Sequence, residues 1–167
     1  MSINFFDAKC QGVSNNEKFW LNDDPHPSQN PAYIVECEDK KWIAEVVNAG
    51  KYLVTFTAVD NCIETKRIDG KMDKRCDGFL SYDSTIAFVE LKKRSGLGKE
   101  WVKDGEKQLR ATIGHFEAGE DAEKFTTKKA YIANSERPKF KESQTRRMEQ
   151  FLNDTGYTLR IENRIRL

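Results

Sequence analysis

Residues 78–91 constrain the fold of this chain more than any other segment, because two apolar runs follow each other there almost without interruption. The first run covers residues 78–82 and the second covers 85–91, and only Asp83 and Ser84 separate them. Two short apolar runs joined by two turn-forming residues are typical of a β-hairpin. We therefore expect a sheet built around this hairpin.

Two charged residues interrupt the second run of this hairpin. Glu90 and Lys92 are two residues apart, so their side chains leave the strand on the same face. Burial of an unpaired charge is costly, which favours a pair or a bound ligand at this position. Counting back from the turn places Asp77 opposite Glu90 on the neighbouring strand. The alternative, in which Glu90 and Lys92 face water at a fraying strand end, stays open.

The expected neighbours Asp77 and Glu90 would repel one another unless a cation lay between them. An oxygen-lined site of this kind suits Mg²⁺ or Mn²⁺. A lysine beside the metal, here Lys92, can orient or deprotonate a water molecule and stabilise charge on a phosphate. The pattern indicates hydrolysis of phosphodiester bonds.

Asp77 followed by Glu90-Leu91-Lys92 resembles the signature of the PD-(D/E)XK nuclease superfamily, which includes restriction endonucleases, Holliday-junction resolvases and RecB-like exonucleases. The resemblance implies that Asp77 and Glu90 are metal ligands and that the backbone carbonyl of Leu91 is a further ligand. It also implies that Lys92 is the catalytic lysine. The chain departs from the common pattern at Cys76, where many members have a proline.

Two more residues are candidates by the same resemblance. Many members carry an acidic residue on the first helix. Glu45 is the candidate here, ahead of Glu36, Glu38 and Glu64, and a solvated helix carboxylate is the alternative for Glu45. RecB-like members have a glutamine on the helix after the hairpin, followed four residues later by a tyrosine. Gln108 matches the glutamine, while Thr112 stands at the tyrosine position. An ordinary surface glutamine is the alternative for Gln108.

The remaining elements follow from hydrophobic periodicity. We expect an irregular arm over residues 1–38, a core over 39–135, and a C-terminal helix and strand over 136–167. The elements expected outside the hairpin are a helix at 39–48, a strand at 52–59, a helix at 100–116, a strand at 129–133, a helix at 141–153 and a strand at 157–165. This order, αβββαβ plus a helix and a strand, predicts an α/β (α+β) protein with a restriction-endonuclease-like core. Its central mixed sheet would have four or five strands flanked by helices.

Length and composition fit one globular domain over residues 1–167. Hydrophobic residues make up 38% of the chain and charged residues 33%, a balance that excludes a disordered chain and a membrane protein. The N-terminus lacks the features of a secretory signal, so we expect a cytoplasmic protein. The four cysteines, Cys10, Cys37, Cys62 and Cys76, form no Cys-x-x-Cys pair and are expected to be reduced thiols.

Nucleic acid, most simply DNA, is the expected partner, although the net charge of +1 neither supports nor excludes it. Three basic residues lie nearest the hairpin, namely Lys93, Arg94 and Lys99. They are expected to contact the phosphate groups of nucleic acid. Endonuclease or exonuclease action and pairing into a homodimer stay undecided. The alternative function is a catalytically silent nuclease-fold binding protein, or an interaction protein such as an inhibitor of a phage or defence system.

Overall fold

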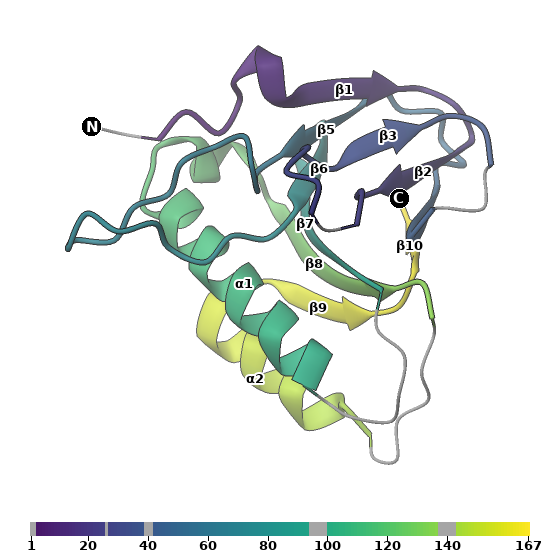
Figure 1. Cartoon of the computed structure of the whole chain (residues 1–167). Helices are drawn as coiled ribbons and strands as arrows, with labels where there is room; N and C mark the ends of the chain where they lie inside the picture. The colour runs from purple at the N-terminus through teal and green to yellow at the C-terminus, as the bar shows by residue number, and fades with distance from the viewer. Residues whose placement is uncertain (1–2, 26, 39–41, 94–99, 137–142) are drawn as a thin grey trace.

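The computed structural model describes residues 3–25, 27–38, 42–93, 100–136 and 143–167. Over these residues the protein is mixed α/β, with two helices, a six-stranded mixed sheet and a four-stranded mixed sheet. Figure 1 shows both helices on one side of the larger sheet and the smaller sheet on its other side. No helix in the described ranges is long and apolar enough to cross a membrane.

The larger sheet has the strand order β1-β5-β6-β7-β8-β9. Its strands are β1 (Gln11–Ser14), β5 (Val54–Ala58), β6 (Gly78–Tyr82), β7 (Thr85–Lys92), β8 (Thr127–Asn134) and β9 (Thr158–Ile161). Neighbours are antiparallel as far as β7, and the β7–β8 and β8–β9 pairs are parallel. Parallel neighbours need crossover connections, and these contain α1 (Glu100–Glu117) and α2 (Thr145–Thr155).

The hairpin expected from the sequence is confirmed. β6 and β7 are antiparallel, with Tyr82 paired to Thr85 on either side of the two-residue turn. Asp83 has a φ of 48°, the left-handed conformation that a tight hairpin turn requires. The helix that follows is also confirmed, and its apolar stripe of Val102, Leu109 and Ile113 is buried.

The smaller sheet was not expected from the sequence. Its strands, in the order β10-β4-β2-β3, are β10 (Arg164–Arg166), β4 (Ala44–Val47), β2 (Lys18–Asn22) and β3 (Tyr33–Val35). The irregular arm predicted at 1–38 is therefore wrong, because β1, β2 and β3 lie in it. The predicted helix at 39–48 is also wrong: its described part contains β4, where Ala44 and Val46 are fully buried and alternate with half-buried neighbours. That burial has the period of a strand.

The C-terminal segments differ from the expectation in their bounds. The single strand predicted at 157–165 is two strands, β9 in the larger sheet and β10 in the smaller. The helix predicted at 141–153 begins at Thr145, and residues 141–142 lie outside the described ranges. The 3-10 helices η1 (Ala8–Cys10) and η2 (Asp121–Lys124) complete the set.

β7 separates two hydrophobic cores because its side chains alternate between the faces of the sheet. Ile86 and Phe88 belong to the core beneath the two helices. Ala87, Val89 and Leu91 belong to the core shared with the smaller sheet. Since Glu90 and Lys92 continue the series of Ile86 and Phe88, they emerge on the helix side of the sheet.

The expectation of reduced thiols is wrong for two of the four cysteines. Cys10 of η1 and Cys62, in the connection after β5, form a disulfide, with their Cα atoms 5.9 Å apart. Cys37 and Cys76 are free thiols, the first exposed and the second buried. The bonded pair is 52 residues apart in the chain, and the β1–β5 pairing helps to bring the two together.

Candidate active site

The hairpin register brings Asp77 and Glu90 together at the end of the β6–β7 pair. The last paired residues are Gly78 and Val89, and Asp77 and Glu90 are the next positions outward. The Asp77 carboxylate accepts a hydrogen bond from the backbone N–H of Leu91 at 2.6 Å. Asp77 is 6% exposed and Glu90 is 3% exposed, so both carboxyl groups are inside the protein.

Lys92 lies between Glu90 and the helix α1. Its Nζ is 3.3 Å from Oε1 of Glu90 and donates to Oε1 of Gln108 at 2.7 Å. The amide nitrogen of Gln108 in turn donates to the backbone carbonyl of Arg75 at 3.3 Å. The structure therefore brings together four of the residues named from the sequence, Asp77, Glu90, Lys92 and Gln108.

The two carboxyl groups of Asp77 and Glu90 resist ionisation in this setting. Burial raises the pKa of Glu90 to about 7, even though the Lys92 ammonium favours the ionised form. Burial, followed by the charge of Glu90, raises the pKa of Asp77 well above its usual range. Within the described part of the chain, Oε2 of Glu90 is buried and has no hydrogen-bond partner. The pair is therefore stabilised by a retained proton or by a bound cation.

Two further acidic residues surround the pair and were missed in the sequence. Asp23, directly after β2, and Asp60, just after β5, both add to the elevated pKa of Asp77. Asp60 is also 3.2 Å from a guanidinium nitrogen of Arg75. Each residue sits at the end of a strand distant in sequence from the hairpin, so no local pattern marks it.

Helix α1 covers the site closely because Gly105 faces it. A Cβ at Gly105 would lie 3.4 Å from Cγ of Glu90 and 3.2 Å from Cγ2 of Ile132. One turn further along the same face, Gln108 contacts Lys92. Thr112 then accepts a hydrogen bond from the backbone N–H of Cys76 at 2.8 Å. This stripe of α1 therefore fixes Lys92 and the chain directly before Asp77.

Not every residue named from the sequence lies in this site. Glu45 is on β4 rather than on a helix, and its carboxylate is 3.4 Å from Lys18 and 3.6 Å from Arg164. It therefore belongs to the smaller sheet. Lys93 follows β7 directly and is exposed. Arg94 and Lys99 lie outside the described residues.

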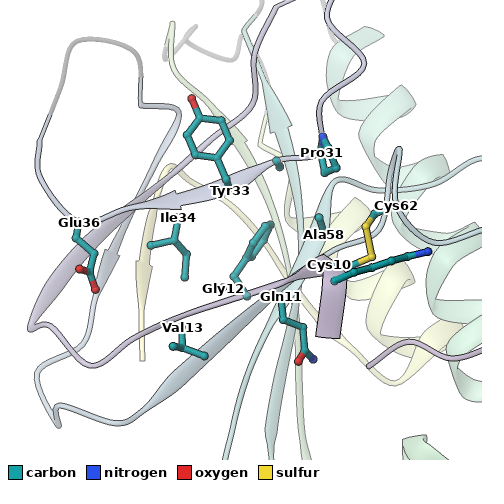
Figure 2. A pocket seen from close by; sticks show the side chains of 13 residues that line it. Cys10, Gln11, Gly12, Val13, Pro31, Tyr33, Ile34, Glu36, Ala58 and Cys62 are labelled. Carbon is teal, nitrogen blue, oxygen red and sulfur yellow. A yellow bond between two sulfur atoms is a disulfide. The ribbon is translucent and has the colours of Figure 1, made fainter. Parts of the chain in front are cut away.

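A separate hollow of about 580 Å³ lies between the edge strands β1 and β3 (Figure 2). The Cys10–Cys62 disulfide closes one end of it, and Val13, Tyr33 and Ile34 line its walls. Lys9 and Glu36 are its charged lining residues. None of the candidate site residues named from the sequence lines this hollow, so it is distinct from the carboxylate site.

The carboxylate site offers acid–base groups and two anionic oxygen donors. No group of three or more His, Cys, Asp or Glu side chains placed to hold a metal ion is found among the described residues. Any divalent cation here would need a backbone oxygen or water in addition to the carboxylates. Comparison of the chain with protein-family models, curated proteins and solved structures finds no match.

Proposed function

We propose that the protein is a metal-dependent nuclease that hydrolyses phosphodiester bonds, with DNA as the substrate. The observation that carries this proposal is the buried pair Asp77 and Glu90 with the ammonium of Lys92 3.3 Å from Glu90. Two buried carboxylates with one lysine are costly for folding alone, since each charge loses its hydration. Such a cost is typical of a functional site.

The arrangement of the strands supports a restriction-endonuclease-like core. The run β5, β6, β7, α1, β8 has three antiparallel strands, a helical crossover and a parallel strand, as the resemblance to PD-(D/E)XK nucleases implies. The chain departs from that pattern before β5, where β4 stands in place of a first helix. Glu45 is consequently left out of the proposed site.

The residues present fit Mg²⁺ or Mn²⁺. Asp77 and Glu90 would hold the ion together with the backbone carbonyl of Leu91, and the unpartnered Oε2 of Glu90 is an available donor. Hard oxygen donors of this type match these ions. When bound, the ion supplies Lewis-acid polarisation of the phosphate and neutralises developing negative charge.

The protein's own residues provide orientation and charge. Lys92 presents an ammonium group that can hold an attacking water molecule and stabilise the negative phosphate oxygens. Gln108 fixes this ammonium at 2.7 Å and is itself tied to the Arg75 backbone, so the lysine is oriented before substrate binds. Lys93, which is exposed directly after β7, would contact a neighbouring phosphate.

The test compares the full-length protein with Lys92→Ala on labelled DNA in Mg²⁺ or Mn²⁺. Cleavage should fall by about 10² to 10³ in rate in the variant, the usual effect of losing one charge-stabilising group. DNA affinity in Ca²⁺ should change little, since both carboxylates and the neighbouring cations remain. Lys103→Ala, an exposed lysine on α1, is the matched control and should cleave like the wild type. EDTA should abolish cleavage by all three proteins.

Two results would overturn this assignment. Cleavage that continues in EDTA would exclude the metal-dependent mechanism, and a folded Lys92→Ala variant with wild-type cleavage would remove Lys92 from it. The second candidate function is a nuclease-fold protein that binds without cutting. It is favoured by the small donor set, which offers two carboxylates rather than three. DNA binding with no cleavage in either Mg²⁺ or Mn²⁺ would select this candidate.

A further inference from the structure

A second concave surface lies on the strands at the C-terminal side of the larger sheet. It is a groove of about 670 Å³ formed by β8, β9 and β10. Its charged and aromatic lining includes Lys129, Tyr131, Arg160, Glu162, Arg164 and Arg166. We call this surface the β8–β10 groove.

The β8–β10 groove concentrates positive charge that the rest of the protein lacks. Five of the 28 basic side chains line it, against one of the 27 acidic side chains, Glu162. Because the whole chain has a net charge of only +1, the residues outside the groove carry an excess of three acidic side chains. The groove therefore attracts anions more than the net charge of the chain suggests.

Three of these five cations are not neutralised by the protein. Lys128 pairs with Glu117, and Arg164 pairs with Glu45. Within the described ranges, Lys129, Arg160 and Arg166 take part in no ion pair. Unpaired cations gathered in one groove repel each other, and a bound anion would relieve that repulsion.

The three unpaired cations come from β8, β9 and β10 and line the same groove. Lys129 and Tyr131 of β8 pair with Thr158 and Arg160 of β9, so all four share one face of the sheet. Burial raises the pKa of Tyr131 and the charge of Glu162 adds to this effect, while Arg160 and Arg166 both oppose it. Arg160 of β9 and Arg166 of β10 therefore lie near enough to Tyr131 to favour its ionised form.

This face is the opposite one from the carboxylate site. Ala130 and Ile132, which alternate with Lys129 and Tyr131 along β8, belong to the core beneath the helices, on the side of Glu90. The groove also lies near the start of β8, whereas Glu90 pairs with Ile132 further along that strand. It is therefore not an extension of the proposed active site.

We propose that the β8–β10 groove binds the phosphate backbone of a nucleic-acid strand at a second site, away from the cleavage site; naming nucleic acid rests on the proposed function. The cations are distributed over three strands, β8, β9 and β10. Such a row suits a polymer of phosphates better than a single small anion, because each contact releases counterions. Contacts to phosphate carry no sequence information, so the proposed binding should be independent of sequence.

The test measures binding of a fluorescently labelled single strand and its duplex by anisotropy in EDTA, where cleavage does not interfere. The double variant Arg160→Gln with Arg166→Gln should bind about tenfold more weakly at low salt. The slope of log affinity against log salt should become shallower by about 1.8 for duplex or 1.4 for single strand, as expected for two lost phosphate contacts. Lys9→Gln with Arg146→Gln removes two exposed cations elsewhere and should bind like the wild type.

The binding measurements test the groove proposal independently of the nuclease proposal. Equal losses in the groove variant and its control would overturn the proposal, and so would an unchanged salt slope. A different result would be that the protein binds vesicles of phosphatidylserine and phosphatidylcholine through the groove and binds neither nucleic acid. That result would overturn the proposal and identify an anionic lipid surface as the ligand. If the wild type binds nucleic acid through the groove but never cleaves it, the groove proposal stands and the nuclease proposal fails.

Discussion

Asp77 and Glu90 bring two carboxyl groups into the interior at the end of one hairpin, and their titration should control stability. In the folded protein Glu90 holds its proton up to about pH 7, against about 4.5 in the unfolded chain. The folded state therefore binds more protons in this window. The free energy of unfolding must then fall as pH rises from about 4.5 to 7, which is the reverse of a carboxylate stabilised by a salt bridge.

Urea unfolding in EDTA at about pH 5 and about pH 8 checks this sign. The wild type should lose more stability between the two values than Glu90→Gln, which cannot ionise at that position. Glu149→Gln, an exposed position on α2, is the control and should follow the wild type. Mg²⁺ added at the higher pH should restore stability to the wild type if it binds the ionised pair. Equal pH dependence in the wild type and Glu90→Gln would contradict the burial argument.

At the residue scale, the positions of Asp77, Glu90 and Lys92 follow from short-range rules. A two-residue turn fixes the register, and the period of two places Glu90 and Lys92 on one face. Asp23 and Asp60 escaped prediction because their place depends on how distant strands pair. Glu45 was misplaced for the same reason, since the helix expected around it is a strand in another sheet.

At the element scale, helix α1 packs closely against the buried carboxylate site. Its two glycines, Gly105 and Gly114, lie in different surroundings, so substituting each of them shows whether this close packing matters. A Cβ at Gly114 would meet nothing within 4 Å, whereas one at Gly105 would press on Glu90 and Ile132. Gly114→Ala should stabilise the protein by about 1 kcal/mol, the usual gain in helix propensity. Gly105→Ala should lose this gain through overpacking, and it should also slow cleavage by displacing Glu90.

Chemical denaturation and the DNA-cleavage assay measure both effects of this glycine pair. Gly114→Ala serves as the internal control, since it makes the same change on the same helix away from the site. If Gly105→Ala gained as much stability as Gly114→Ala and cleaved normally, the close contact between α1 and Glu90 would not be a constraint.

The elements that the sequence predicted correctly are those with strong local periodicity. They include α1, the β6–β7 hairpin, β5 and β8, and also α2 with shifted bounds. The segment around β4 was misassigned because Trp42, Ile43, Val46 and Val47 also fit a helical stripe. Its burial is set instead by pairing with β2 on one side and β10 on the other. Strands of three to five residues in the smaller sheet are too short for alternation to identify them.

At the scale of the whole molecule, the Cys10–Cys62 disulfide links η1 to the connection that carries Asp60. Closing a loop of 52 residues restricts the unfolded chain, and a bond of this kind contributes about 2–4 kcal/mol to stability. Cys62→Ser should therefore unfold at lower urea concentration than the oxidised wild type. Cys37→Ser, which removes an exposed free thiol, should leave the midpoint unchanged. An oxidised wild type no more stable than its reduced form would contradict the pairing.

The smaller sheet can be completed only late in synthesis, because β10 lies near the C-terminal end of this sequence. β4 is flanked by β2, which precedes it in the chain, and by β10, which follows it by more than a hundred residues. During synthesis on the ribosome, one edge of β4 must stay without its partner until Arg164–Arg166 has emerged. An open strand edge is prone to pair with other chains. Stalled translation before this point would therefore release an aggregation-prone product, even though the hairpin with the proposed site had already been made.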